Sequence, residues 1–425
     1  MEEKRKKMMI LGASALQVPA IKKAKELGYQ IILVDYDENA VGFALADVKL
    51  VVSTLDQEEV YRQALIYEPD VVITSTSDGP VRTAAYVNEK LGKRPDLSYE
   101  NSLCATIKSK MRDRLKECGV PIPEYYAATD FEGFSEAVDR LDGHCIVKPA
   151  DNAGSRGVVL LGGSKWQNGE QQENFEDREQ GESQERKRRI YEYSRENSRN
   201  GTVMVEEYME GPEVSVEIMV VEGEPHILAI TDKYITPPPY FVELAHCEPS
   251  RLGAETQNRI REVASQAVRA VGIENAPAHV EIKVTEDGPK IVELAARLGG
   301  DFITSKLVPL STGIDMVGAS VLLATGEKPD LTRTREQGAA IHFIHAKEEQ
   351  RGVLERITVP ESLCEAEGVK EIVLYQKPGA IVQGTHSSND RLGHVITVGK
   401  TAEEAMERGK QILDKIQVEI KAARA

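Results

Sequence analysis

The sequence predicts an α/β protein of two or three domains, and three observations support this fold class. Its 425 residues are more than one ordinary hydrophobic core holds. Near the N-terminus, short apolar strands alternate with helices, which is typical of a parallel, Rossmann-like sheet. From about Thr334 the pattern changes to short β segments with Gly turns, followed by a final helix near Ala402–Ile416.

The N-terminal elements place a candidate ligand region at one edge of the predicted sheet. The glycine spacing after the first strand is not GxGxxG, so a dinucleotide site is weakly supported. Ligands of such sheets lie beyond the carboxyl ends of the strands, which points to Ser14, Asp35 and the loop Ser75–Asp78. The expected elements are strands Lys7–Leu11, Gln30–Val34 and Val71–Thr74 and helices Val18–Leu27 and, further on, Thr106–Cys118.

Composition argues against several classes of protein. The formal net charge of −16 argues against a duplex nucleic-acid binder, which would need a basic face. No apolar run reaches transmembrane length, and the apolar stretch after the charged segment Met1–Lys7 is expected to be a strand, since it has no signal-peptide cleavage pattern. The five cysteines are scattered and contain no CxxC pair, so we expect neither a structural zinc nor a disulfide framework. A reducing, cytoplasmic location is expected, without nucleic-acid or membrane partners.

Two acidic strands, His279–Thr285 and Lys290–Arg297, are the most informative feature of the chain. They flank Glu286-Asp287-Gly288, a strong hairpin signal, and Glu281 and Glu293 lie equally far from Asp287. We therefore expect these two carboxylates to face each other, on the face shared by Ile291, Ala295 and Arg297. At about 4 Å they would repel by roughly 4 kcal/mol at an effective dielectric of 20, which favours a bound cation such as Mg²⁺. A solvated acidic hairpin is the alternative.

A glycine-rich turn follows a buried strand that contains a lysine. Ile146–Pro149 includes Lys148, and Gly154-Ser155-Arg156-Gly157 precedes the apolar strand Val158–Leu161. Glycines leave backbone N–H groups free to approach phosphate oxygens, and lysine supplies a point charge for them. The alternative is an ordinary β-hairpin turn.

The segment Val203–Val221 is expected to form two strands joined by a connection. Its junction Glu206-Glu207-Tyr208 could present backbone donors and acceptors to an adenine edge, and Glu213 could accept from ribose hydroxyls. Alternatively, each glutamate is a solvated residue at a strand edge. The preceding stretch Gly169–Asn200 is polar and is expected to be a solvated, partly helical insertion.

The order of these motifs resembles the ATP-grasp superfamily and, within it, the carboxylate–amine ligases. The resemblance covers nearly the whole chain and implies an α/β (α+β) ATP-grasp fold. It implies a Rossmann-like pre-ATP-grasp domain at 1–104, an ATP-grasp domain at 105–333 and a β-rich C-terminal cap at 334–425. The ATP-grasp domain would include a small lid subdomain at about 120–208, with the polar insertion at 169–200.

The resemblance also implies roles for individual residues. Glu281 and Glu293 would bind one or two Mg²⁺ ions, with Mn²⁺ as an alternative. Arg297 would hold the acyl phosphate or the carboxylate substrate, and Lys233 would approach the phosphates; both are catalytic candidates. The implied ATP-binding residues are Lys108, Lys148, Gly154, Ser155, Arg156, Gly157, Glu206, Glu207, Tyr208 and Glu213.

One position departs from the family pattern. Many relatives have an asparagine that coordinates the second magnesium two residues after the second metal glutamate, and this chain has Ala295 there. Water could complete the coordination shell, because Mg²⁺ usually keeps several waters. A weakened second metal site, or lost activity, is the alternative.

The implied reaction joins a carboxylate to an amine through an acyl phosphate, with release of ADP. An amino-acid substrate is expected, and the candidate substrate residues are Tyr240, Glu243, His246 and Gly300. Two alternatives remain open, namely a biotin- or purine-type carboxylase that phosphorylates bicarbonate and a non-catalytic ATP-binding regulator. The partners would be small-molecule carboxylates and amines, and a homodimer is left open.

Overall fold

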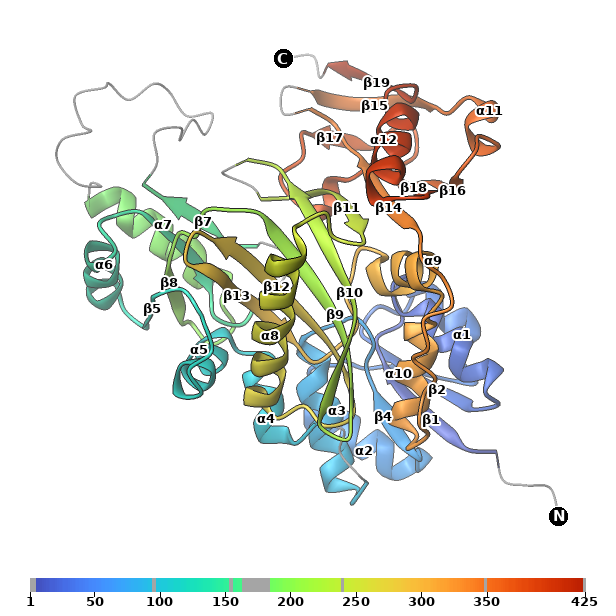
Figure 1. Ribbon diagram of the computed structural model, residues 1–425. Helices are drawn as coiled ribbons and strands as arrows, with labels where there is room; N and C mark the ends of the chain where they lie inside the picture. Colours follow the sequence, from blue (N-terminus) through green and yellow to red (C-terminus); the bar gives the residue numbers. More distant parts are fainter. Residues whose placement is uncertain are drawn as a thin grey trace.

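Four β-sheets and the helices packed on them form the described part of the chain in the computed structural model (Figure 1). The structure describes residues 5–93, 97–152, 156–162, 184–237, 241–347 and 350–422. The predicted residues Gly154, Ser155 and Tyr240 lie outside these ranges.

The N-terminal sheet is parallel, as the sequence predicted. Its strands are ordered β3-β2-β1-β4, and β1 and β2 are almost wholly buried, as expected for strands covered on both faces. Asp56 caps the second helix by accepting from Glu59 N. The elements are β1 (Lys7–Leu11), α1 (Val18–Glu26), β2 (Gln30–Asp35), η1 (Val41–Leu45), β3 (Val48–Val51), α2 (Gln57–Tyr67), β4 (Val71–Ile73) and α3 (Gly79–Lys90).

Two helices, α4 (Tyr99–Cys104) and α5 (Lys108–Glu117), lead into a small antiparallel sheet of order β5-β8-β6-β7. The insertion predicted at 169–200 is helical at α7, as expected, but it is not wholly solvated, because Ile190 and Tyr191 pack in the core of this sheet. Residues 169–183 of the insertion lie outside the described ranges. The elements are β5 (Tyr125–Ala128), α6 (Phe131–Arg140), β6 (Cys145–Pro149), β7 (Val159–Leu161), α7 (Gln184–Glu196) and β8 (Val203–Glu207).

The largest sheet has eight antiparallel strands in the order β13-β12-β9-β10-β11-β14-β18-β16. It continues across the boundary predicted at 333/334, because β14, β16 and β18 follow that point in the chain. Helix α8 (Ala254–Val271) covers one face with its apolar side. The strands are β9 (Glu213–Val221), β10 (Glu224–Ile235), β11 (Glu243–Glu248), β12 (Pro277–Thr285), β13 (Gly288–Ala295), β14 (Gly338–Ile344), β16 (Val369–Leu374) and β18 (Gly393–Gly399).

The acidic hairpin has the predicted pairing of Glu281 with Glu293, but its geometry differs from the expected one. Thr285 pairs with Gly288 across a two-residue turn, and a bulge after Glu281 shifts the register by one residue. The bulge places Ile291 opposite Ile282, in the core against α8. The expectation that Ile291 shares the face of Glu293 is therefore wrong.

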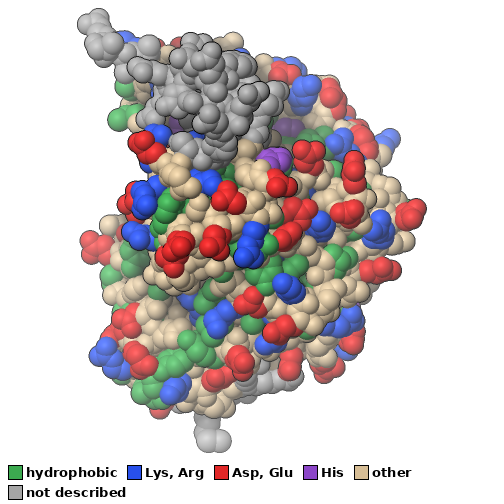
Figure 2. Space-filling view, turned by 90° about the vertical axis from the view of Figure 1, so that its left-hand side faces the viewer, with side chains coloured by type: hydrophobic (Ala, Val, Ile, Leu, Met, Phe, Trp, Pro, Cys, Tyr) green, Lys and Arg blue, Asp and Glu red, His purple; other side chains and the backbone are tan. Residues whose placement is uncertain are grey.

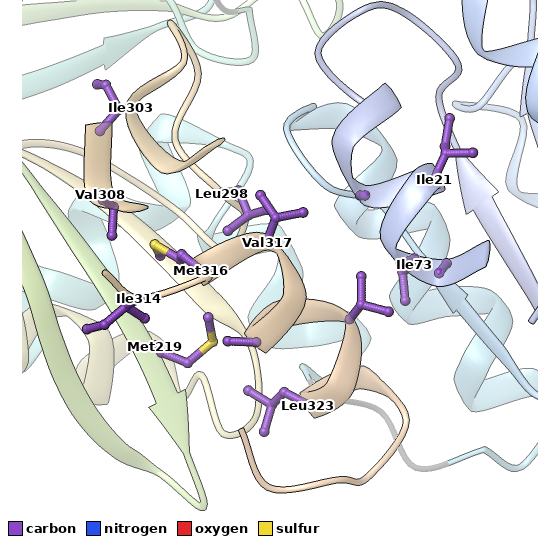
Figure 3. Close-up of a cluster of buried hydrophobic side chains, with 14 of the residues drawn as sticks. Ile21, Ile73, Met219, Leu298, Ile303, Val308, Ile314, Met316, Val317 and Leu323 are labelled. Atoms are coloured by element: carbon purple, nitrogen blue, oxygen red, sulfur yellow. The ribbon is translucent and has the colours of Figure 1, made fainter. Parts of the chain in front are cut away.

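A large apolar cluster joins the N-terminal sheet to the eight-stranded sheet (Figure 3). Ile21 comes from α1 and Ile73 from β4, which belong to the N-terminal unit formed by the parallel sheet and its helices. Met219 comes from β9, and Val317 and Leu323 come from α10. This shared core fixes the position of the segment that follows β13. The helical elements of the cluster are η3 (Ile303–Leu307), α9 (Val308–Thr312) and α10 (Met316–Ala324).

No single described helix is long and apolar enough to cross a membrane. The helices over 303–312 and 316–324 reach the required length and composition only as a pair bent by 115°. Many of their side chains belong to the buried apolar cluster of Figure 3.

The C-terminal region contributes strands to the large sheet and also forms a small sheet of order β17-β15-β19. The predicted final helix is present, although it ends at Leu413 and a strand that was not predicted follows it. On the face shown in Figure 2, acidic and basic side chains are interspersed, so the net negative charge is not concentrated there. The remaining elements are β15 (Arg351–Thr358), α11 (Glu361–Cys364), β17 (Ile381–Gln383), η4 (Ser388–Asp390), α12 (Ala402–Leu413) and β19 (Gln417–Ala422).

Candidate active site

The polar face of the large sheet carries three rows of side chains that are set by the strand register. Side chains alternate along each strand, so Val214, Val280 and Ile282 point to the opposite face and are buried against α8. In the order β13, β12, β9 and β10, the rows are Lys290, Lys283, Glu213 and Lys233; Glu293, Glu281, Ser215 and Thr231; and Ala295, His279, Glu217 and Ala229.

Each carboxylate of the Glu281–Glu293 pair has a lysine of its own. Lys108 Nζ lies 2.7 Å from Glu293 Oε1, and Lys233 Nζ lies 2.9 Å from Glu281 Oε1. Burial opposes ionisation of Glu281, but Lys233 and His279 outweigh it and hold the pKa of Glu281 well below its usual range. Glu281 therefore faces Glu293 across adjacent strands as an ionised carboxylate, with lysines beside both side chains.

This donor set fits a divalent cation that is only partly held by protein. Carboxylate oxygens are hard ligands, and Mg²⁺ is commonly bound by one or two carboxylates together with substrate phosphates and water. Within the described ranges, no three His, Cys, Asp or Glu side chains form a self-contained metal cluster. Glu281 and Glu293 therefore match a Mg²⁺ site in which the protein supplies two carboxylates and the substrate and water supply the other ligands.

Lys233 bridges two rows of the sheet. Its Nζ lies 2.7 Å from Glu213 Oε1, in addition to its contact with Glu281. Burial disfavours the ammonium, but Glu213 and Glu281 outweigh burial and raise the pKa of Lys233 well above its usual value. Glu213 also pairs with Lys283 at 3.2 Å, so its carboxylate is engaged by two lysines rather than being freely solvated.

His279 lies opposite Ala295, the position that departs from the family pattern. Its Nδ1 is 2.6 Å from Glu217 Oε1, and its Nε2 is 3.5 Å from Glu281 Oε1. Burial disfavours the imidazolium, but Glu217 outweighs burial and raises the pKa of His279 to about 9. A protonated histidine therefore occupies the sheet face next to the carboxylate pair.

Glu206 is buried, which contradicts its interpretation as a solvated edge residue. Arg112 donates to both of its carboxylate oxygens at 2.9 Å, and Lys148 Nζ lies 2.7 Å from Oε2. Burial opposes ionisation, but Arg112 and Lys148 lower the pKa of Glu206 to about 2. Arg112 also donates to the carbonyls of Ile291 and Val292, so it holds the hairpin at the bulge.

Burial, together with the neighbouring Arg112 and Lys108, lowers the pKa of Lys148 in spite of Glu206. Lys148 stands at the end of β6, where the predicted glycine-rich loop begins. The strands β6 and β7 that flank this loop pair antiparallel, as the sequence predicted.

The other predicted nucleotide residues line the junction between the sheets. Glu207 pairs with Lys290 at 3.0 Å, and the Tyr208 ring lies 5.0 Å from the His144 ring. Gly157 has a φ of +77°, and a Cβ there would lie 2.7 Å from both Asn197 and Pro149. The close approach and the positive φ explain why glycine ends this loop.

Arg297 is held by a carboxylate from the N-terminal unit. Its Nε donates to Asp78 Oδ1 at 2.7 Å and its Nη2 to Asp78 Oδ2 at 3.2 Å. Asp78 lies in the loop that the sequence marked as a ligand region, although no pairing between the two residues was expected.

The substrate candidates Glu243 and His246 belong to a further charged cluster. His246 Nε2 is 3.1 Å from Asp301, and Arg391 pairs with Asp301 at 2.7 Å and with Glu243 at 2.8 Å. The Arg391 guanidinium also lies 3.7 Å above the Phe343 ring. The fourth candidate, Gly300, adjoins open space, because a Cβ there would meet no atom within 4 Å.

A cavity of about 820 Å³ lies where the N-terminal sheet meets the carboxylate hairpin. The predicted ligand region lines one side, and the candidate ATP-binding residues Lys108 and Arg156 line the cavity together with Glu293. Its walls include Ser14, Asp35, Thr76, Ser77, Asp78, Lys108, Asn152, Arg156 and Glu293.

Sequence reasoning did not assign roles to Arg112, Asp78, Asp301 or His279. Their importance arises from partners far away in the chain, such as Glu206, 94 residues after Arg112, and Arg297, 219 residues after Asp78. The one sequence feature that pointed to any of these residues was the position of Asp78 after a parallel strand, which marked it as part of a candidate ligand region.

Two regions of the chain match known domain families. Residues 141–305 match the family model of the ATP-grasp domain, and residues 342–421 match that of the L-amino acid ligase C-terminal domain 2. The chain is 26% identical over 262 residues to the alanine–anticapsin ligase of Bacillus subtilis, covering 57% of this chain and 51% of that protein. It is 27% identical over 310 residues to an uncharacterized protein of Sinorhizobium fredii, covering 72% of this chain and 60% of that one.

The fold is also shared with a solved structure. The L-amino acid ligase from Bacillus licheniformis superimposes with a TM-score of 0.79 at 20% identity, covering 99% of this chain and all of that one. The alignments span about half to three-fifths of the length of the two curated relatives.

Residues 141–305 thus match the ATP-grasp domain family, and the chain shares its fold with the solved L-amino acid ligase. Residues 342–421 match the C-terminal domain 2 of L-amino acid ligases, which makes this end of the chain similar to those enzymes.

Proposed function

We propose that the protein is an ATP-dependent carboxylate–amine ligase that joins an amino acid to an amine and releases ADP and phosphate. The observation that carries this proposal is the Glu281–Glu293 pair, with a lysine on each carboxylate. Glu293 and Lys108 line the cavity between the N-terminal sheet and the hairpin, where two substrates can meet.

In the first step, an oxygen of the substrate carboxylate attacks the γ-phosphorus of ATP, and the bond to the β-phosphate oxygen breaks. The products of this step are an acyl phosphate and ADP. The amine then attacks the acyl carbon, phosphate leaves with the bonding electrons, and the amine loses a proton. Catalysis of this kind depends mainly on positioning and charge stabilisation.

The chain supplies cations where negative charge develops. Lys108 and Lys233 would turn from Glu293 and Glu281 toward the phosphates, and Arg297 would hold the carboxylate or acyl phosphate. Mg²⁺ held by Glu281 and Glu293, or Mn²⁺ in its place, would neutralise phosphate charge when bound. Ala295 offers no side-chain ligand, so water would have to complete the coordination of a second ion at this position, which lies opposite His279.

Nucleotide binding is proposed at the junction between the small and large sheets. Lys148 would contact phosphates at the start of the glycine-rich loop, and the backbone after Glu206 would face adenine. The Glu206 side chain would support the site indirectly, because it pairs with Lys148 and Arg112 and would not itself contact the nucleotide.

The charged cluster around Asp301 supports an amino-acid substrate. Glu243 and Asp301 are carboxylates suited to an ammonium group, while Arg391 and His246 are suited to a carboxylate. The C-terminal domain match and the L-amino acid ligase of similar fold support the same substrate class.

The test is phosphate release from Mg-ATP with all twenty amino acids, singly and in pairs, with and without bicarbonate, and with products identified by mass. We expect ADP formation that depends on particular pairs, together with a condensed product. ADP formation that requires bicarbonate would instead establish a carboxylase. ATP binding without turnover in any mixture would establish a regulator.

A further inference from the structure

The Asp78–Arg297 contact joins two units of the fold at the candidate carboxylate-binding residue. Asp78 precedes α3 in the N-terminal unit, and Arg297 follows β13 in the large sheet. The contact is bidentate along one edge of the guanidinium, through Nε and Nη2. The side chains are only 14% exposed for Arg297 and 21% for Asp78, so water competes weakly for this edge.

The guanidinium has five N–H donors, and the contacts use three of them. Asp78 accepts two, and the carbonyl of Leu298 accepts one from Nη1 at 3.0 Å. In the described part of the chain, the other two donors, one on each terminal nitrogen, have no protein acceptor. Two such donors match the two oxygens of a carboxylate, so Arg297 can hold an anion without releasing Asp78.

The backbone fixes this arrangement as well. Leu298 N donates to Ser75 O at 2.8 Å, so the segment after β13 is bonded to the loop that carries Asp78. Leu298 also belongs to the apolar cluster between the two units (Figure 3). The position of Arg297 is therefore set by three kinds of contact, and Asp78, together with the Leu298 carbonyl, orients its guanidinium plane.

Asp78 also lies close to other cations. Burial opposes its ionisation, but Arg297, with smaller effects from Lys108 and His279, outweighs burial and lowers the pKa of Asp78. Asp78 lines the cavity together with Lys108 and Glu293, so its carboxylate borders the place where the substrates would meet.

We propose that Asp78 is a positioning residue for the acid substrate: it fixes one edge of Arg297 so that the other donors face the substrate carboxylate or acyl phosphate. This inference rests on the proposed ligase function. The opposite reading is that Asp78 occupies the place of the substrate carboxylate and must be displaced. The two readings predict opposite changes in the KM for the acid when Asp78 is removed.

The experiment compares Asp78→Asn and Asp78→Ala with the wild-type protein in the ADP-formation assay. We expect the KM for the acid to rise roughly 10- to 100-fold in Asp78→Ala, because a misplaced clamp loses about that much. Asp78→Asn keeps one acceptor oxygen, so its KM for the acid should lie between those of wild type and Asp78→Ala. The KM for ATP should change less than about threefold in both variants. An unchanged or lowered KM for the acid would overturn the proposal.

Asp47→Asn is the matched control. Asp47 belongs to the same unit and accepts a 2.7 Å hydrogen bond from Ile31 N, but it does not line the cavity. We expect Asp47→Asn to leave the KM for the acid and the KM for ATP unchanged. A change in either value would reveal a general effect of losing a carboxylate in this unit. Urea unfolding of all variants separates loss of stability from loss of positioning.

A second measurement is independent of activity. Solvent exchange of the Arg297 Nε–H can be followed by NMR, with Arg297→Lys used to assign the signal. We expect slow exchange in the wild-type protein and fast exchange in Asp78→Ala. Slow exchange in both would overturn the proposal. If no amino-acid mixture supports ADP formation, the proposed function fails, while the exchange data still decide whether Asp78 fixes Arg297.

Discussion

Lys108 Nζ donates a 2.7 Å hydrogen bond to Glu293 Oε1, although 185 residues separate the two in the chain. The Lys108 side chain is 11% exposed, and its other acceptor is the carbonyl of Asn152. Removing the Glu293 carboxylate would therefore leave a buried ammonium with one neutral acceptor.

This pair allows the roles of Glu293 in activity and in stability to be separated. Glu293→Gln keeps a carbonyl acceptor for Lys108 and should abolish ADP formation, because an amide replaces a metal-binding carboxylate. Glu293→Ala should also be inactive and should lose about 1–3 kcal/mol of unfolding free energy, because Lys108 loses its partner. Phosphate release and urea unfolding measure the two effects.

Glu286→Gln is the control for this prediction, since Glu286 is exposed in the turn of the same hairpin. We expect normal activity and stability within about 0.5 kcal/mol of wild type. Wild-type turnover by Glu293→Gln would contradict the proposed metal-binding role of the carboxylate pair.

The sequence was sufficient to predict the parallel sheet, the hairpin and the pairing of Glu281 with Glu293. These features follow from local patterns, namely β–α alternation and the period-two placement of polar side chains. The equal spacing around Asp287 gave the right pair only because a bulge compensates for the two-residue turn. The side chain of Ile291, for which no such compensation occurs, was assigned to the wrong face.

Long-range ion pairs could not be predicted in this way. From its neighbours in the sequence, a glutamate such as Glu206 is expected to be solvated. In the structure its side chain is buried, because α5 places Arg112 beside it. A helix within the polar insertion was predicted, but the burial of one face of α7 was not, because its few apolar residues gather on the side that packs in the core of the small sheet.

Glu206 is expected to be the most important carboxylate for stability in this region. Glu206→Gln would leave the buried Arg112 and Lys148 side by side without an anion, and we expect a loss of about 3–5 kcal/mol. Glu207→Gln removes a carboxylate that is 37% exposed and should lose less than about 1 kcal/mol. Urea unfolding of the two variants gives the comparison, and equal losses would show that the buried network is not a special stabilising feature.

Gly157 and Gly201 offer a matched test of steric crowding at the glycine-rich loop. Both have positive φ, +77° and +74°, but a Cβ at Gly201 would meet no atom within 4 Å. Gly201→Ala should therefore lose about 1–2 kcal/mol from backbone strain alone. Gly157→Ala should lose more, because its Cβ would approach Asn197 and Pro149, and it should raise the KM for ATP. The prediction fails if thermal unfolding and ATP kinetics do not distinguish the two variants.

Glu248 predicts a specific dependence of stability on pH. It is fully buried and accepts hydrogen bonds from Thr231 at 2.8 Å and Ser311 at 2.7 Å, and no basic side chain of the described residues is bonded to it. Burial outweighs these hydrogen bonds and raises the pKa of Glu248 to about 8. Between its ordinary pKa of 4.5 and about 8, the folded protein therefore holds a proton that the unfolded chain releases.

Its contribution to the free energy of unfolding should therefore fall as the pH rises through that window, by an amount on the order of 4 kcal/mol. Glu248→Gln carries no ionisable group, so its stability should fall less than that of wild type over the same range. Urea unfolding at intervals from pH 4.5 to 8 measures the difference, and Glu286→Gln should follow the wild-type curve. Parallel curves for Glu248→Gln and wild type would show that Glu248 is ionised in the folded protein, because only a raised pKa makes the curves diverge.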